Sequence, residues 1–296
     1  MSLPKAGLHG IYPKRGIFTD DVAGEIYGMI GTSPELGRLL GATANLLSAA
    51  SLPDRTIGDA FGSVMSALAR FDFIVVFAYR GGARPIDLYS TFGPDDYRIF
   101  VTLYQAGPYL LDPFYRTARE RRAGIFRMRE LAPDRFFSSE YYRTYYSQTQ
   151  LAEEVGFFVP TDEGVTVVLS LMRKSGRRAF PERQFGLLKQ AEPFVAALVR
   201  RFWSELALCF DDETSRENHD PVASQSRSTD VWGRMDLTPR EAAIVELVLQ
   251  GHSSEATGRQ LGIATGTVKV HRRNIYRKLG ISSQTQLLSL YLKNMA

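Results

Sequence analysis

The stretch TVKVHRRNIYRKLG, Thr267 to Gly280, sets basic side chains between a sparse set of apolar ones. On a helical wheel that advances about 100° per residue, Val268, Ile275 and Leu279 return to within roughly 20° of one direction. These three residues predict a stripe that faces a core. The opposite side is basic or neutral and has no nearby carboxylate to pair with its charges: Gly266, Lys269, Val270, Arg273 and Arg277. Such a face fits an acidic partner.

His271 lies on the flank of this stripe. A partly buried histidine with a local hydrogen bond is expected, because no second histidine or cysteine stands nearby at the spacing of metal ligands. A catalytic or metal-binding role is the alternative. Gly280 ends the predicted helix, since glycine readily takes the left-handed conformation that closes many helices.

The positive charge of the chain is concentrated at its C-terminal end. From Met235 to Ala296 there are eight Lys or Arg residues and four Asp or Glu residues, a net charge equal to the +4 of all 296 residues. The preceding part of the chain is therefore electrically balanced. Because the excess gathers in a small terminal module, and largely on one helix, it indicates nucleic-acid binding.

A polar segment, Asp211 to Asp230, comes before this module and is almost without large apolar residues, so we interpret it as a linker. After it, Thr238 and Glu241 have the spacing of a capping box, with Pro239 at the first helical position. This pattern predicts a helix that begins at Pro239 and that Gly251 ends.

A second short helix, from Ser253 or Ser254 to Leu261, and a tight turn lead into the basic helix. Two short helices joined by a turn, of which the second is basic, predict a helix-turn-helix. A last helix, about Ser283 to Leu292, has more apolar surface than so small a bundle buries. We expect one face of it to contact a second copy in a homodimer, through Leu287, Leu290 and Tyr291.

From about Leu237 to Leu292 the chain resembles the LuxR-type four-helix DNA-binding domain, through LTPRE, GHSSE, LGIATGTVKVH and IYRKLGISSQTQLL. The resemblance implies that the third helix enters the major groove of double-stranded DNA and that the fourth makes the dimer contact. Arg and Lys donate to guanine edges and neutralise phosphates. The positions that match groove-facing residues are Lys269, Val270 and Arg273, and those that match backbone contacts are Thr267, Arg277 and Lys278. Two such helices about 34 Å apart predict an inverted-repeat operator.

Two positions depart from the usual pattern of this family. The second helix has Glu255, Ala256 and Thr257 where Glu-Ile-Ala is common, and Ala264 stands where a serine usually caps the third helix. Losing such a cap costs about 1 kcal/mol. Thr265 is the residue available to replace the cap, and it is also a candidate DNA contact.

The larger N-terminal part predicts an α+β domain. Strands are expected at residues 71–79 and 85–92 around a Gly81-Gly82 turn, and at 154–161 and 164–174. Helices are expected at residues 33–51, 95–105, 111–122, 138–150 and 182–206. This order predicts a single antiparallel sheet with helices against its faces.

Several of these segments resemble the autoinducer-binding domain of LuxR-type receptors, a PAS- or GAF-like α/β/α sandwich. They are the Tyr-rich helix, Leu111-Asp112-Pro113, EEVGFFVP and GVTVVLSLMRK. The resemblance implies that Asp112 accepts a hydrogen bond from the amide of a ligand. The tryptophan that those receptors use further along is missing: Arg127 stands near its place, and Trp203 and Trp232 lie elsewhere. An acyl-homoserine lactone is therefore the less favoured effector.

Tyrosines are concentrated in YLLDPFY, residues 109–115, and SSEYYRTYY, residues 138–146. Rings with polar tips are typical of ligand pockets, although core packing equally explains any single one. Asp112 either caps a helix that begins at Pro113 or binds ligand. A carboxylate that points inward among rings favours an amine, through charge pairing and cation–π contact. The candidate ligand-binding residues are Tyr104, Tyr109, Asp112, Tyr115, Phe126, Tyr142 and Tyr145.

Other classes of protein fit less well. The strand FDFIVVFAY does not end in the aspartate of a phosphorylated receiver domain. No nucleophile elbow, Walker loop or paired metal ligands stand in the sequence, so we expect neither an enzyme nor a bound metal or cofactor. A single cysteine, Cys209, excludes an internal disulfide. No apolar run approaches the ~20 residues of a membrane span and no signal peptide is evident, so we expect a cytoplasmic protein without a membrane partner.

Together these patterns predict a DNA-binding transcriptional regulator in four parts. They are a flexible tail at residues 1–20, a ligand-sensing and dimerisation domain at 21–209, a linker at 210–235 and the helix-turn-helix domain at 236–296. The expected effector is a small molecule that is amine-bearing or amphipathic. The alternative is a ligand-independent regulator whose N-terminal domain serves only dimerisation or contact with another protein.

Overall fold

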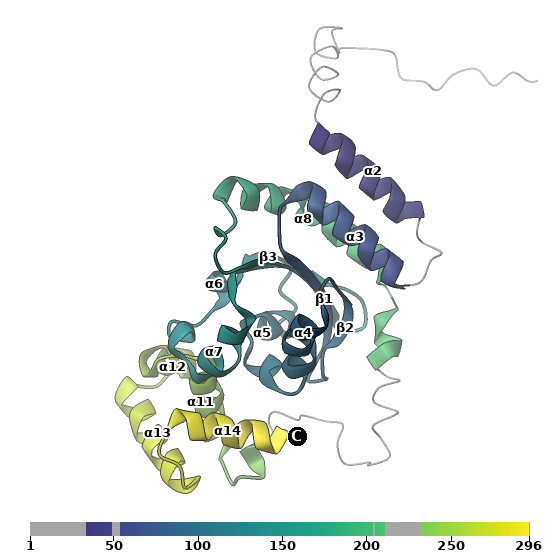
Figure 1. Ribbon diagram of the computed structural model, residues 1–296. Coiled ribbons are helices and arrows are strands. Elements are labelled where there is room, and N and C mark those ends of the chain that lie inside the picture. The colour runs from purple at the N-terminus through teal and green to yellow at the C-terminus, as the bar shows by residue number, and fades with distance from the viewer. Residues whose placement is uncertain (1–33, 49–53, 204, 211–231, 296) are drawn as a thin grey trace, which may run out of the picture.

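A five-stranded antiparallel sheet forms the centre of the larger part of the chain, in the order β2-β1-β5-β4-β3. The computed structural model describes residues 34–48, 54–203, 205–210 and 232–295 (Figure 1). The strands are β1 (Phe73–Arg80), β2 (Ile86–Ser90), β3 (Gly124–Arg127), β4 (Leu151–Pro160) and β5 (Val165–Lys174). The two long strands β4 and β5 pair with each other along nearly their whole length.

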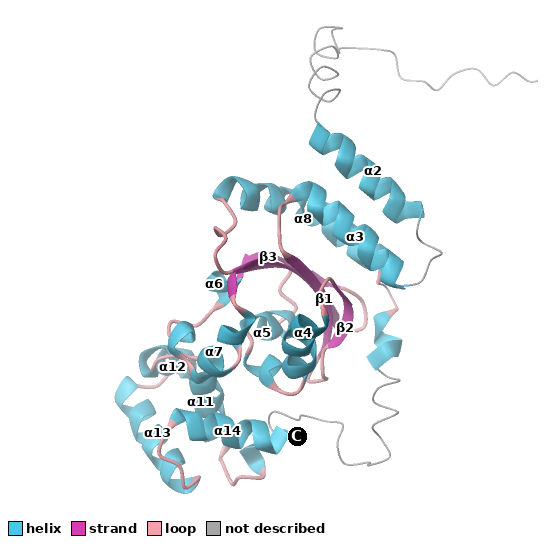
Figure 2. Ribbon diagram, viewed as in Figure 1, coloured by secondary structure: helices cyan, strands magenta, loops and turns pink. Residues whose placement is uncertain are grey.

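Both faces of the sheet are apolar because helices cover both. On β1, Ile74 and Val76 face one layer, and Val75 and Phe77 face the other. The first layer holds α3 (Asp54–Leu68) and α8 (Glu182–Phe202), with α2 (Pro34–Ser48) packed on α3. The second holds α4 (Pro94–Tyr97), α5 (Pro113–Arg119), α6 (Met128–Leu131) and α7 (Glu140–Thr144), as Figure 2 shows. This is the predicted α/β/α sandwich around an antiparallel sheet.

The helices of the second layer are shorter and more interrupted than the sequence predicted. The helix expected at 95–105 is present but contains a π-helical stretch, η1 (Arg98–Leu103). The continuous helices expected at 111–122 and 138–150 are wrong. Asp112 is extended and separates the 3₁₀ turn η2 (Pro108–Leu111) from α5, because a residue before proline is excluded from the helical conformation. The second segment divides into η3 (Phe136–Ser138), α7 and η4 (Tyr146–Thr149).

The C-terminal part is the predicted four-helix helix-turn-helix domain. Its helices are α11 (Pro239–Gln250), α12 (Ser254–Leu261), α13 (Thr265–Lys278) and α14 (Gln284–Met295). The capping box of α11 forms as expected: the hydroxyl of Thr238 accepts from the amide of Glu241, whose carboxylate accepts from the amide of Thr238 at 2.9 Å. Gly251 ends α11 with a φ of 101°. Most of the predicted linker lies outside the described residues.

This helical domain packs against the second layer of the sandwich. The amide of Arg135 donates to the carbonyl of Gly251 and the amide of Ser253 donates to Asp134, each at 3.0 Å. Nη1 of Arg116 lies 3.1 Å from Nε2 of His252. Burial, together with the charge of Arg116, lowers the pKa of His252 to about 4. One apolar cluster therefore runs from the sheet through η2, α5 and α7 into α11 and α14.

The sequence also led to expectations about membrane-spanning helices and about the single cysteine. Within the described ranges, no helix combines the length and the apolar character that crossing a bilayer requires. The single cysteine, Cys209, is a free and exposed thiol.

Candidate functional site

The helix α13 presents its basic side to solvent at the periphery of the molecule (Figure 1). Val268 and Ile275 are buried against α11 and α12, as the periodicity predicted. The residues on the opposite side are exposed: Thr267, Lys269, Val270, Arg273 and Arg277. Among the described residues, no carboxylate forms an ion pair with Lys269, Arg273 or Arg277. Three cations are therefore open to a polyanion on one helix face.

Two further candidate DNA contacts have neighbours of their own. Nζ of Lys278 lies 3.3 Å from the carboxylate of Glu241, the acid of the α11 capping box. Thr265 is the first residue of α13 and is half-buried, while Ala264 holds the capping position without a side-chain bond. Thr265 therefore does not replace the missing cap. To contact a phosphate, Lys278 exchanges an existing partner for it.

A narrow cavity lies between the sheet and the second helical layer of the sandwich. The space in it that water-sized molecules can occupy is about 30 Å³, and about 410 Å³ lies between its lining atoms when the open solvent at its mouth is included. Strands β1, β4 and β5 form one wall, and the segments from η1 to α5 and from α7 to η4 form the other. The lining residues are Val75, Phe77, Tyr79, Phe100, Tyr104, Asp112, Phe114, Tyr141, Tyr145, Tyr146, Thr149, Leu151, Glu154, Ser170 and Met172. None of these described residues is basic, and two are carboxylic acids.

Asp112 caps α5, which confirms one of the two alternatives left by the sequence, and it also lines the cavity, while its contact with a ligand stays a prediction. Its Oδ1 accepts from the amide of Phe114 at 2.9 Å, and its Oδ2 accepts from the hydroxyl of Tyr104 at 2.7 Å. The hydroxyl of Tyr104 also lies 3.0 Å from that of Tyr79. Burial raises the pKa of Asp112 to about 6, although both donors lower it. The carboxyl is thus fixed in position by its own wall.

Glu154 is the second acid of the cavity and was not predicted. It stands on β4, is buried, and meets hydroxyl groups: that of Tyr146 at 3.5 Å and that of Ser170. Burial, and then the charge of Asp112, raises the pKa of Glu154 to about 8. The alternation of side chains along β4 could have predicted the position of Glu154. Val155 and Phe157 face α8, so Glu154 faces the tyrosines.

Relatives of known class match both parts of the chain. Residues 235–291 match the family described as bacterial regulatory proteins, luxR family. A putative HTH-type transcriptional regulator from the exeN 3' region of Aeromonas salmonicida is 31% identical over 187 residues, which cover 62% of this chain and 94% of that protein. The chain belongs to the LuxR family of bacterial regulatory proteins. Its C-terminal helix-turn-helix is accordingly a DNA-binding domain.

Other proteins match shorter or less closely superposed parts. The putative HTH-type transcriptional regulator YhjB of Escherichia coli is 37% identical over 57 residues, which cover 19% of this chain and 28% of that protein. The VqsR ligand-binding domain of Pseudomonas aeruginosa is 28% identical over 54% of this chain and 93% of that domain, with a TM-score of 0.47.

The cavity of this LuxR-family chain brings together three of the seven candidate ligand residues, Tyr104, Asp112 and Tyr145. Four lie outside its lining: Tyr109, Tyr115, Phe126 and Tyr142. Tyr109 and Tyr115 pack edge to face, with ring centroids 5.0 Å apart, and both join the cluster that meets α14. Phe126 packs against Phe158, and Tyr142 packs against Phe136 and Phe137. These four rings serve the core and the contact between the domains.

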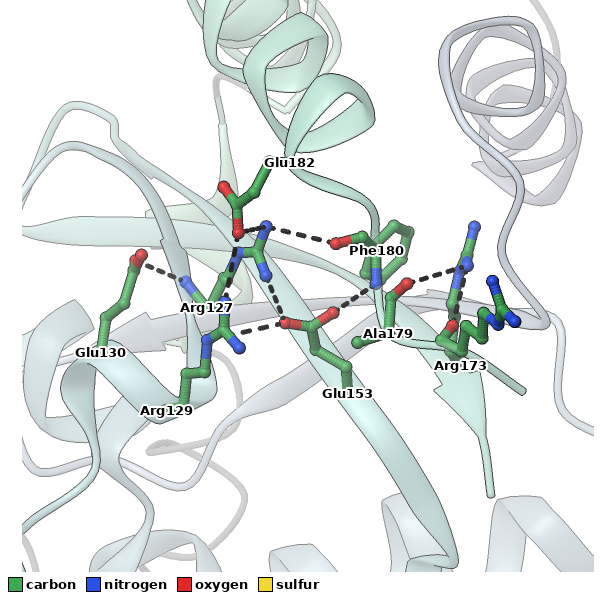
Figure 3. Close-up of polar contacts among 9 residues, drawn as sticks. Arg127, Arg129, Glu130, Glu153, Arg173, Ala179, Phe180 and Glu182 are labelled. Atoms are coloured by element: carbon green, nitrogen blue, oxygen red, sulfur yellow. Dashed lines mark hydrogen bonds and ion pairs between the residues drawn. The ribbon is translucent and has the colours of Figure 1, made fainter. Parts of the chain in front are cut away.

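Arg127 is not among the residues that line the cavity, and Figure 3 shows it on the α8 side of the sheet, beside Glu182 and Phe180. Alternation along β3 explains this, since Ile125 and Arg127 share the face that α8 covers. The guanidinium lies 2.9 Å from Glu153 and 3.0 Å from Glu182, and it stacks 4.2 Å from the ring centroid of Phe185. Arg127 therefore does not stand in for the missing tryptophan.

The apolar face of α14, expected to meet a second copy, is covered by the chain itself in this structure. Leu287 and Tyr291 are buried, and Leu290 is half-buried. Tyr291 stacks on Trp232, with ring centroids 5.1 Å apart, and it lies close enough to Tyr109 and Tyr115 to interact with them electrostatically. Since α14 also contacts α7, the N-terminal domain covers part of the face that was expected to meet a second copy.

Proposed function

We propose that this LuxR-family regulator reads an inverted-repeat operator through α13 and that a small molecule in the tyrosine-lined cavity controls it. The observation that carries the second part is the cavity itself, in which two buried carboxyls and five tyrosines converge with no basic residue among the lining. Buried acids without a counterion are costly in a purely structural core. The expected effector is amine-bearing or amphipathic.

The test is a thermal-shift screen of the full chain with amines, amino acids and acyl-homoserine lactones. A compound that raises the melting temperature is then added to a titration with DNA selected from a random pool, followed by fluorescence anisotropy. Sensor function requires one compound to change both quantities. If stabilising compounds leave DNA affinity unaltered, the N-terminal domain serves only dimerisation or protein contact, which is the alternative function.

Arg273→Ala and Lys269→Ala are each expected to weaken binding to selected DNA by about 1–3 kcal/mol, because each removes a donor to a base edge. Both side chains are exposed, so circular dichroism and melting temperature stay unchanged. The matched control is Lys293→Ala, which removes the same charge from an exposed position on α14. Anisotropy at fixed salt checks the result. Variants that lose no more affinity for selected DNA than for random DNA contradict this role.

We also propose that the active species on DNA is a homodimer paired through Leu287, Leu290 and Tyr291. Because α14 contacts α7 and Tyr291 lies near Tyr109 and Tyr115 in this structure, pairing through this face of α14 requires the DNA-binding domain to leave the N-terminal domain. Footprinting of the full chain is expected to protect two half-sites about 34 Å apart. Protection of one unrepeated half-site by a monomer would contradict it.

A further inference from the structure

The two acids of the cavity are not equally available to a ligand. Both oxygens of Asp112 already accept short hydrogen bonds, one from the α5 backbone and one from Tyr104. Glu154 accepts from Tyr146 at 3.5 Å, the outer limit of a hydrogen bond, and from Ser170. A ligand therefore finds Asp112 engaged and Glu154 weakly held.

Among the described residues that line the cavity, none is a cation that could pair with either acid. The titratable groups that face Glu154 are acids or phenols: Asp112 before α5, Tyr79 on β1, and Tyr141, Tyr145 and Tyr146 from α7 to η4. Burial raises the pKa of each of these tyrosines, so at neutral pH they are uncharged donors and acceptors. An ionised Glu154 in these surroundings needs a positive charge from outside the chain.

The rest of the lining fits an apolar body attached to that charge. Ring faces attract cations, and Tyr141, Tyr145 and Tyr146 stand on the wall that faces Glu154. Beyond them the lining is apolar, with Phe77, Phe100 and Met172 among its members. A primary ammonium group supplies three donors, which suit a carboxylate and the surrounding phenol oxygens.

We infer that Glu154 is the anchor for the ammonium group of an arylalkyl- or alkylamine, and that Asp112 instead holds the cavity wall by fixing α5 and Tyr104. The inference rests on the proposed function, in that it names the ligand class and the specificity residue of the same cavity. The contact with the ligand's cation is thereby assigned to Glu154 and not to Asp112, the acid that the sequence indicated.

The test compares amines with alcohols of the same skeleton, phenethylamine with 2-phenylethanol and hexylamine with 1-hexanol. Isothermal titration calorimetry on the full chain is expected to show about 10- to 100-fold tighter binding of each amine, the range of a charge-assisted hydrogen bond. Glu154→Gln keeps the shape of the side chain and removes its charge. In this variant, amine and alcohol are expected to bind with about equal affinity. Asp112→Asn is expected to weaken amine and alcohol alike, since it loosens the wall that both touch.

Glu140→Gln is the matched control, because it makes the same change on α7, where Glu140 pairs with Arg143 rather than facing the cavity. Wild-type protein supplies a second readout that does not depend on a variant folding. Burial raises the pKa of Glu154 to about 8, and an ammonium group pairs with the ionised form, so amine binding at pH 7 is expected to release protons. Titrations in buffers of different ionisation enthalpy measure that release, and alcohols are expected to show none.

Three results would overturn the role of Glu154 as the anchor. They are equal affinity of the wild-type chain for amine and alcohol, no binding of the amine, and a preference for the amine that persists in Glu154→Gln. These results are distinct from failure of the proposed function. An alcohol that binds in the cavity and alters DNA affinity preserves the sensor and overturns the anchor. An amine preference that depends on Glu154, in a chain whose DNA affinity no cavity ligand changes, preserves the anchor and overturns the sensor.

Discussion

Replacing Arg127 by methionine is expected to lower the free energy of unfolding by about 3–5 kcal/mol, the cost of leaving a buried ion pair with one partner. The side chains of Arg127 and Glu153 are 2% and 6% exposed and lie 2.9 Å apart. Glu153 also accepts from the amide of Phe180, and Nη2 of Arg127 donates to the carbonyl of that residue. The pair therefore ties β3, β4 and the segment before α8 together (Figure 3).

The matched control is Arg129→Met, which removes a neighbouring arginine that also reaches Glu182, at 3.4 Å, but is 54% exposed. Solvent screens such a charge, so its loss is expected to cost less than 1 kcal/mol. Urea denaturation followed by circular dichroism measures both variants. Similar stabilities for the two would show that burial of Arg127 adds nothing to the fold.

Gly251→Ala is expected to detach the DNA-binding domain from the N-terminal domain. Gly251 has a φ of 101°, and a Cβ atom there would lie 3.0 Å from Cα of Phe136 and 3.1 Å from Cβ of Ser139. The left-handed conformation costs alanine about 1–2 kcal/mol, and overlap with a neighbouring backbone typically adds about 1–3 kcal/mol. The clash falls where the two domains meet, beside the hydrogen bond from Arg135 to Gly251, so separation relieves it.

Gly262→Ala is the control, because Gly262 also ends a helix with a positive φ, of 65°, but has open space around its Cβ position. Hydrogen exchange measured by mass spectrometry reports docking through the amides of Arg135 and Ser253, which donate across the interface. We expect both amides to exchange faster in Gly251→Ala and at the wild-type rate in Gly262→Ala. Unchanged protection in Gly251→Ala contradicts the predicted separation.

The sequence predicts well what repeats locally. The stripe of α13, its exposed basic side and the capping box of α11 follow from spacing within about one or two turns, and the structure confirms them. The sheet was predicted from alternating apolar runs, except for β3, whose four residues are too few to show a period. Pro113 should have divided the helix expected at 111–122, since the rule that places Asp112 outside a helix is local.

The cavity and the docking surface were harder to predict because they join residues distant in sequence. Tyr109 and Tyr142 are as aromatic as Tyr104 and Tyr145, and only the positions of η2 and α7 decide which rings face the cavity. Which protein surface covers α14 depends on two whole domains and not on a pattern in either. Glu154 is the exception, because the alternation of β4 already assigned it to the side away from α8.

The wall of the cavity is also the surface on which the DNA-binding domain rests. Asp112 and Phe114 face the cavity. In the same segment of the chain, Tyr109 lies near Tyr291 of α14, and Arg116 lies 3.1 Å from His252. Thermodynamic linkage makes this coupling reciprocal. If a bound molecule shifts the docking equilibrium toward the undocked state by some factor, undocking raises the affinity for that molecule by the same factor. Under the proposed function, an operator that captures undocked pairs would therefore raise the affinity for such a molecule, and the amount of accessible operator would set the concentration at which the effector acts.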